Sequence, residues 1–158
     1  MTDIYEPQAE FLTWVLSGDA PLTGSPFAET NLRRVIALMN DAQTANRDWA
    51  TFILALAEVD GDEVRTALMA ATKDVDAVVR GEALLGLAMR DRDLALPLVR
   101  RELEGDEWGS PTFEAAELLA DPSLLGALRR CQGTAKKEWM NREIADAIVA
   151  CERAITPD

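Results

Sequence analysis

The chain has 158 residues, 48% of them hydrophobic, so it is long enough to bury one cooperative core without a metal ion or a disulfide. Its 28 acidic residues outnumber its 16 lysines and arginines, and the net charge of −12 argues against nucleic-acid binding and favours a basic partner. The N-terminus lacks a signal-peptide pattern, and no run approaches the roughly 18 apolar residues of a membrane span. We therefore expect a cytoplasmic protein that makes no contact with a membrane.

Several kinds of chemistry are disfavoured by the residue types present. The absence of histidine removes the commonest general base, the commonest metal ligand and every histidine-dependent triad. The acidic cluster at 60–63 lacks the ligand pattern of a calcium loop and is interpreted as a turn with a helix cap, and the cluster at 102–107 is interpreted as a solvated turn. We expect neither a metal nor a cofactor. Cys131 and Cys151 are separated by a turn and about 17 residues of predicted helix, roughly 26 Å, which is too far for a disulfide. Both are expected to be buried free thiols.

The N-terminal region is predicted to cap the rest of the chain. A helix over 7–16 is followed by an irregular stretch, 17–26, that contains two glycines and two prolines. We interpret 1–26 as a capping helix with its linker and 27–158 as stacked helix pairs, all within one domain.

Apolar residues recur at helical spacing through the remainder of the chain, and no stretch alternates as a strand does. The pattern predicts an all-α fold. Each helix pair consists of an A helix followed by a B helix, and the pairs are 31–40 with 46–57, 62–73 with 77–89, 94–104 with 111–120, and 122–131 with 134–154.

Residues that favour helix ends fall between these segments. Asp60 with Glu63 resembles a capping box, and Ser110 and Asp121 each precede a proline, as N-cap residues commonly do. Gly133 lies where a helix is expected to end.

The B helices repeat at an interval of 33 residues. Arg47, Ala50 and Leu54 reappear as Arg80, Ala83 and Leu87, and Ala116 continues the series. Repetition at this period indicates a solenoid, in which each unit buries its apolar side against its neighbours. The recurring alanines, and Gly81 and Gly86, predict close approach between helices.

The repeated unit resembles a HEAT-type repeat. In that pattern an aspartate in the turn is followed by an arginine and then, three positions later, by a small residue, as in Asp41, Arg47 and Ala50. The resemblance is good over 31–105, weaker to 131 and absent from 1–25. It implies an α-α superhelix whose B helices line a concave face. It also implies a ladder of contacts between stacked turns, formed by Asp41, Arg47, Asp74 and Arg80.

A candidate binding surface lies on the side of the B helices that points away from the A helices. Phe52 lies about 160° around its helix from Ala50, the centre of the buried side, and its equivalents at the 33-residue offset are Leu85 and Leu118. Alternatively, these side chains pack between adjacent B helices. The predicted partner-binding residues are Asp48, Thr51, Phe52, Leu85, Glu114, Glu117 and Leu118.

These features favour a monomeric, non-enzymatic module that grips a basic protein or peptide on its concave face. Such a module could neutralise a basic toxin, assist assembly or act as an adaptor. The alternative is a HEAT-like enzyme or cofactor handler, of the bilin-lyase type or of the DNA-repair glycosylase type. Asp48 beside Trp49 fits the glycosylase comparison, but the net charge opposes DNA binding. A third reading is a segment of a longer helical array.

Overall fold

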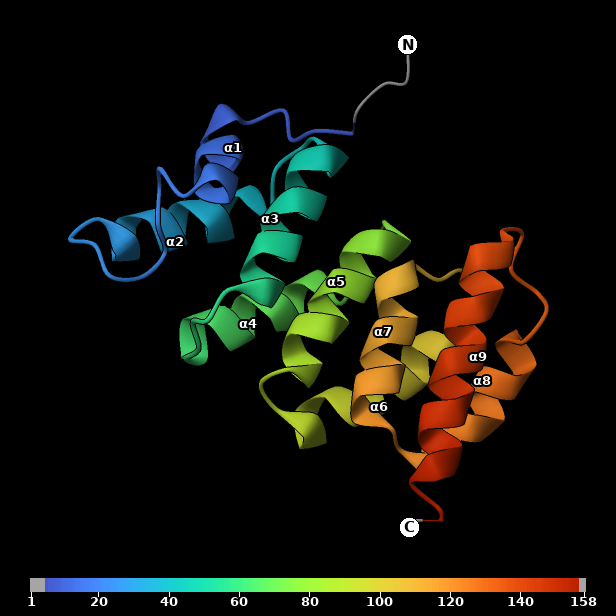
Figure 1. The fold of residues 1–158 in the computed structure, drawn as a ribbon. Coiled ribbons are helices and arrows are strands. Elements are labelled where there is room, and N and C mark those ends of the chain that lie inside the picture. Colours follow the sequence, from blue (N-terminus) through green and yellow to red (C-terminus); the bar gives the residue numbers. More distant parts are fainter. Residues whose placement is uncertain (1–4, 157–158) are drawn as a thin grey trace.

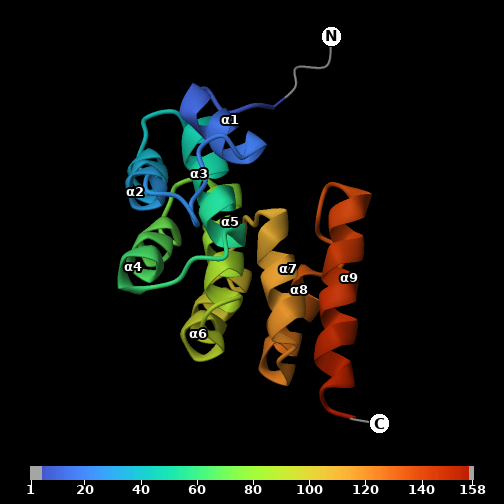
Figure 2. The ribbon, with the colours of Figure 1, turned by 60° about the vertical axis from the view of Figure 1, so that its left-hand side comes forward.

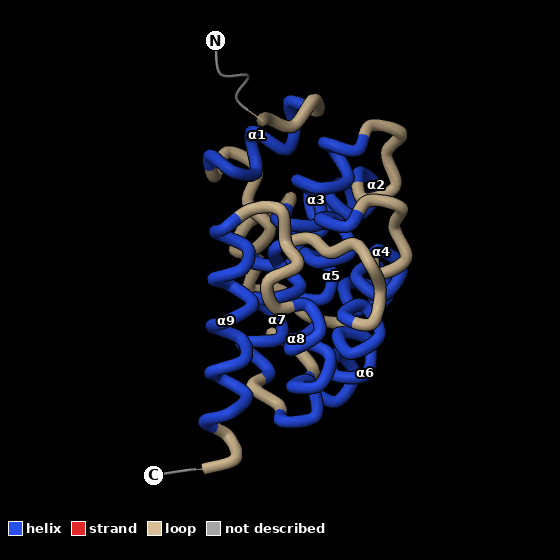
Figure 3. Tube along the Cα trace, turned by 90° about the vertical axis from the view of Figure 1, so that its right-hand side faces the viewer, coloured by secondary structure: helices blue, strands red, loops and turns tan. Residues whose placement is uncertain are grey.

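A computed structural model describes residues 5–156, and this part of the chain contains helices and loops but no strand (Figure 3). The predicted all-α fold is confirmed. The elements are α1 (Glu10–Ser17), α2 (Ala28–Leu38), α3 (Thr44–Leu56), α4 (Asp62–Ala71), α5 (Ala77–Ala88), α6 (Arg92–Leu103), α7 (Ser110–Leu119), the 3₁₀ turn η1 (Pro122–Leu124), α8 (Leu125–Cys131) and α9 (Glu138–Arg153).

The helices form two layers. The B helices α3, α5, α7 and α9 follow one another in a row, and each packs against the next (Figure 1). Each also packs against the A helix of its own pair, and α2, α4 and α6 lie together on one side of the row (Figure 2). Helix α1 packs against α3 at the start of the row. The result is an all-α helical repeat in which each pair contacts mainly its neighbours.

Two of the predicted helix caps are wrong. Helix α4 begins after Gly61, whose φ is +149°, and no side chain caps it. The carboxylate of Asp60 instead forms an ion pair with Arg65 at 2.8 Å. Ser110 is already the first residue of α7, and its hydroxyl donates to Glu143 of α9 at 2.7 Å. In both places the predicted capping side chain binds another side chain, Arg65 of α4 itself for Asp60 and Glu143 of α9 for Ser110.

The predicted boundaries at Asp121 and Gly133 are confirmed, and two further caps appear. The helices predicted over 7–16, 31–40 and 134–154 run instead over Glu10–Ser17, Ala28–Leu38 and Glu138–Arg153. Asp121 accepts a hydrogen bond from the Ser123 N–H at 2.9 Å, and Gly133, with φ of +74°, lies just beyond α8. Asp76 caps α5 and Asp91 caps α6 by accepting hydrogen bonds from backbone N–H groups of the first turn.

Small residues set the distance between B helices. Ala50, Ala83 and Ala116 are completely buried. A Cβ atom added at Gly86 would lie 2.9 Å from the Cα atom and 3.0 Å from the Cβ atom of Ala55. Helices α3 and α5 therefore touch at Gly86, as the sequence predicts, and a larger residue would push them apart.

Arg90 caps the C-terminal end of α3 from the neighbouring helix pair. Its guanidinium donates hydrogen bonds to the backbone carbonyls of Leu54, Ala55 and Ala57 at 2.8 Å and to that of Val59 at 2.9 and 3.1 Å. These carbonyls belong to the last turn and its continuation, where the helix supplies few partners. Burial lowers the pKa of Arg90. The side chain thus joins two consecutive B helices.

Both cysteines are buried free thiols, as predicted, and burial raises the pKa of each. No helix in the described part of the chain combines the length and apolarity needed to cross a membrane.

Candidate functional site

The structure brings the four residues of the predicted ladder together in the turns between pairs. Arg47 of α3 donates to both carboxylate oxygens of Asp74, from Nε at 2.8 Å and from Nη2 at 3.1 Å. Its Nη1 donates to the backbone carbonyl of Asp41 at 3.1 Å. Arg80 donates to the backbone carbonyl of Asp74 at 3.0 Å. Asp74 therefore lies between the two arginines.

The next step of the ladder uses a different acid. Arg80 donates through Nε to Glu102 at 2.8 Å and through Nη2 to the backbone carbonyl of Glu107 at 3.2 Å. The carboxylate of Asp41 accepts from the backbone N–H of Gln43 and the side chain of Asn46, and these hydrogen bonds lower its pKa. These acids are all engaged in contacts within the protein, which is the arrangement that a structural ladder requires.

Two of the predicted partner-binding residues, Thr51 and Leu85, are not exposed on the B-helix face. Thr51 is completely buried, and its hydroxyl donates to the backbone carbonyl of Arg47 at 2.7 Å. Leu85 is also buried, because adjacent B helices approach closely enough to cover it. Phe52 is half-buried, with its ring centroid 5.6 Å from that of Trp49, and Leu118 is exposed. For Leu85 the burial agrees with the alternative interpretation, packing between adjacent B helices.

Three carboxylates lie on the side of the B helices that points away from the A helices. Glu82 of α5 is only 8% exposed, yet it has no ion pair or hydrogen bond with any other residue in the range 5–156. Its pKa is raised to about 8, first by burial and then by the negative charges of Asp48 and Glu114. Glu82 therefore lies on the middle of three consecutive B helices that each contribute an acid. We name Asp48, Glu82 and Glu114 the carboxylate row.

The two outer members of the carboxylate row, Asp48 and Glu114, differ in their contacts with neighbouring side chains. Tyr5 donates to Asp48 at 2.8 Å, and its ring stacks on that of Trp49 with 6.2 Å between centroids. Burial is the main cause that raises the pKa of Asp48. The pKa of Glu114 is raised by partial burial, by Glu143 and by Glu117. Glu114 and Glu117, both predicted site residues, are exposed.

The spacing of the carboxylate row determines what it can bind. Packed helices lie about 8–10 Å apart, so the three acids are spread over three successive B helices. Within residues 5–156, no group of three acidic or sulfur-bearing side chains is arranged to hold one. The carboxylate row can instead receive a separate ammonium or guanidinium group at each acid.

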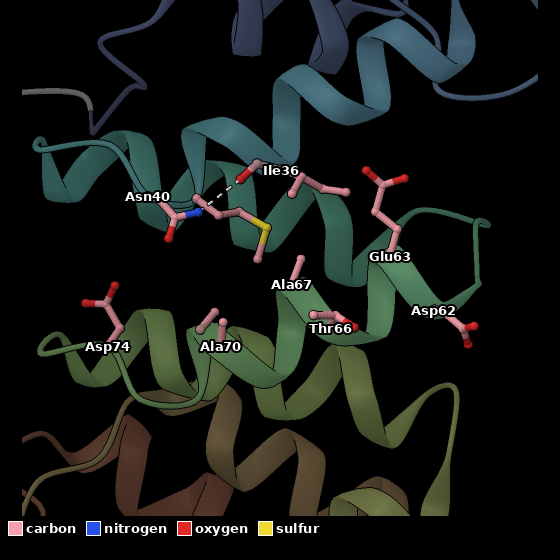
Figure 4. A pocket seen from close by; sticks show the side chains of 10 residues that line it. Ile36, Asn40, Asp62, Glu63, Thr66, Ala67, Ala70 and Asp74 are labelled. Carbon is pink, nitrogen blue, oxygen red and sulfur yellow. Dashed lines mark hydrogen bonds between the residues drawn. The ribbon is translucent and has the colours of Figure 1, made fainter.

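A hollow of about 390 Å³ lies on the other layer of the fold, between the A helices α2 and α4. Figure 4 shows Ile36 and Asn40 on one wall, Ala67 and Ala70 on the other, and acids at opposite ends. One of these acids, Asp74, is held by Arg47, and another, Glu63, lies 3.9 Å from Arg33. This hollow therefore presents less uncompensated charge than the carboxylate row does.

The signal for Glu82 was present in the sequence but weak. Glu82 lies 34 residues after Asp48 and 32 before Glu114, so it falls one position away from the 33-residue register. A glutamate inside a helix usually faces water, and the residue type alone does not show that this one is buried.

The comparisons with known proteins bear on the fold. The chain matches no protein-family model. It is 30% identical over 94 residues to protein YibA of Escherichia coli K12 and of E. coli O157:H7, covering 60% of this chain and 34% of each relative. A crystal structure of E. coli YibA superposes with a TM-score of 0.58 and 23% identity over 91% of this chain and 55% of that one. The chain shares its fold with YibA. It spans about a third of the length of these curated relatives, whose name states no activity.

Proposed function

We propose that the protein is a non-enzymatic binding module, a short HEAT-type array that acts as a monomer and holds a basic protein or peptide on its B-helix face. The observation that carries this proposal is Glu82, a side chain only 8% exposed whose carboxylate reaches the surface and is neutralised by no cation of the described chain. A buried acid without a partner is unfavourable when ionised, and a bound lysine or arginine would remove that penalty.

The charge of the whole chain supports the same class of partner. A net charge of −12 attracts a basic surface over several ångströms and accelerates its encounter. The same charge repels nucleic acid and anionic lipid. Placement in the cytoplasm is part of the proposal and is supported by the two free thiols, since unpaired cysteines are usual in reducing compartments.

The proposal can be tested with a labelled 18-residue helical peptide of lysine and alanine. Its Kd would be measured by fluorescence anisotropy at pH 8, where about half of Glu82 is ionised. The double variant Glu82→Gln/Glu114→Gln is expected to bind the peptide about tenfold more weakly, or roughly 1.4 kcal/mol. The matched control is Glu104→Gln/Asp106→Asn, which changes the net charge equally at two exposed residues of the α6–α7 turn.

The control variant is expected to bind within about twofold of the wild type, and added salt should slow association more than it speeds dissociation. Equal weakening by both double variants would mean that only net charge matters and would refute a site at the carboxylate row. Unchanged binding by the Glu82→Gln/Glu114→Gln variant would refute it as well.

A further inference from the structure

Large apolar side chains are exposed where helices α1, α3 and α5 end. Leu16 and Leu56 are each 46% exposed, and Met89 is 52% exposed. A hollow of about 430 Å³ separates the ends of α1 and α3, and another of about 320 Å³ separates the ends of α3 and α5. Both hollows are lined by Leu56, so they adjoin. We name this surface the apolar trough; it consists of Val15, Leu16, Leu22, Phe52, Leu56 and Met89.

The apolar trough lies on the same face as the carboxylate row. On α3, Asp48, Phe52 and Leu56 follow one another at intervals of four residues, and such residues share one side of a helix. On α5, Glu82 and Met89 are seven residues apart, which also places them on one side. At 1.5 Å per residue the acids and the apolar side chains are separated by about 10–12 Å along each helix. An acidic band and an apolar band therefore run next to each other across α3 and α5.

The charged groups around the apolar trough favour a positively charged binding partner. Glu58 and Asp60 line it, and Arg90, the one cation that residues 5–156 place in its lining, is buried against backbone carbonyls. A second copy of this chain carries the same net charge of −12 and would be repelled. An anionic membrane surface would be repelled for the same reason. A partner that brings positive charge together with apolar side chains is complementary to both bands.

We infer that a basic amphipathic helix of a partner protein lies across α3 and α5, with its cations on the carboxylate row and its apolar side chains in the apolar trough. An α-helix is about 10–12 Å wide with its side chains, which matches the separation of the two bands. This inference rests on the proposed function and adds an apolar anchor and an orientation to it. Leu56 and Met89 supply the contact area, while Glu82 fixes which side of the bound helix faces away from the apolar trough.

The test compares two labelled 18-residue peptides at pH 8. Both carry lysines along one side of a helix, and the other side is leucine in one peptide and alanine in its companion. The variant Leu56→Ser/Met89→Ser replaces two exposed apolar side chains of the apolar trough. The matched control, Val149→Ser/Ile155→Ser, replaces two exposed apolar side chains near the C-terminal end. Thermal unfolding followed by circular dichroism verifies that each variant is folded.

The leucine peptide is expected to bind the wild type at least about tenfold more tightly than the alanine peptide. The Leu56→Ser/Met89→Ser variant should lose this advantage and bind the alanine peptide within about twofold of wild type, and the control should change neither Kd. Equal affinity for the two peptides, or an advantage that survives in the variant, overturns the apolar anchor. If binding of the alanine peptide then still requires Glu82, the proposed function stands alone; if no binding requires Glu82, both fall.

Discussion

Arg47 and Asp74 form a two-point ion pair that joins the first helix pair to the turn of the second. Their atoms meet at 2.8 and 3.1 Å, and the side chains are only 13% and 10% exposed. A planar guanidinium matches a carboxylate in this geometry, and removing either member leaves the other charge buried without its partner. The pair therefore contributes to stacking rather than to ligand recognition.

Arg47→Ala is expected to lower the free energy of unfolding by about 1–3 kcal/mol, because Asp74 loses two hydrogen bonds in a partly buried site. Arg80→Ala should have an effect of similar size through Glu102. Urea denaturation measures both. Arg33→Ala is the control, since Arg33 pairs with Glu29 at the surface and should change stability by less than about 0.5 kcal/mol. An unchanged urea midpoint for Arg47→Ala would show that the ladder does not stabilise the stack.

Arg90→Met is expected to destabilise the protein by about 2–4 kcal/mol, because methionine keeps the apolar stem but leaves the carbonyls at the end of α3 without donors. Arg90→Lys should lie between methionine and wild type, since one ammonium cannot reach as many carbonyls as a guanidinium. Thermal and urea unfolding provide the measurement. Arg101→Met, at an exposed position on α6, controls for the loss of one charge. Equal stability of the two methionine variants would contradict the capping role.

Two glycines in helices are expected to respond to alanine in opposite directions. Gly86→Ala places a Cβ atom 2.9 Å from Ala55 and should cost about 1–3 kcal/mol by forcing α3 and α5 apart. Gly126→Ala, in α8, meets no atom within 4 Å and should stabilise the protein by about 0.5–1 kcal/mol through helix propensity. Denaturation of the two variants under the same conditions tests the pair. Destabilisation by both would point to a general intolerance of alanine instead of a local contact.

Glu82 is expected to make stability fall as pH rises. Its pKa is about 8 in the folded protein and near the ordinary 4.5 in the unfolded chain. Between these values the unfolded chain binds fewer protons than the folded one, so the free energy of unfolding decreases from about pH 4.5 to pH 8 and then levels off. Glu82→Gln should remove this slope and be more stable than wild type at pH 9 by on the order of 2–4 kcal/mol.

Urea denaturation of wild type and Glu82→Gln at pH 5.5, 7 and 9 measures the slope, with Glu104→Gln as an exposed control. A stability difference between wild type and Glu82→Gln that stays constant over this range would mean that Glu82 titrates at its ordinary pKa.

The repeat architecture could be predicted because its determinants are local. The spacing of Ala50 and Leu54 and their recurrence at Ala83 and Leu87 define a helix side without knowledge of its neighbours. The burial of Leu85 could not be predicted in this way. Periodicity identifies the side of α5 that faces the A helices, whereas the distance between α3 and α5 depends on the contact of Gly86 with Ala55.

The roles of Arg90 and Glu82 could not be predicted from the sequence, because both depend on tertiary packing. Arg90 binds backbone carbonyls 31–36 residues earlier, and a carbonyl leaves no mark on residue type. Glu82 differs from an ordinary surface glutamate only in its burial, which depends on how the helices around α5 pack. The ladder residues could be predicted from the sequence, because both members of the charged pair recur at a fixed offset.

The contacts between helix pairs limit the order in which the chain can fold during its synthesis on the ribosome. Arg47 is synthesised 27 residues before Asp74, and Arg80 22 residues before Glu102. Arg90 is synthesised at least 31 residues after the carbonyls that it caps on α3. Since chains emerge N-terminus first, the first helix pair acquires neither its ion pair nor its cap until the second pair has emerged. Each unit of the nascent chain is thus completed by the unit that follows it.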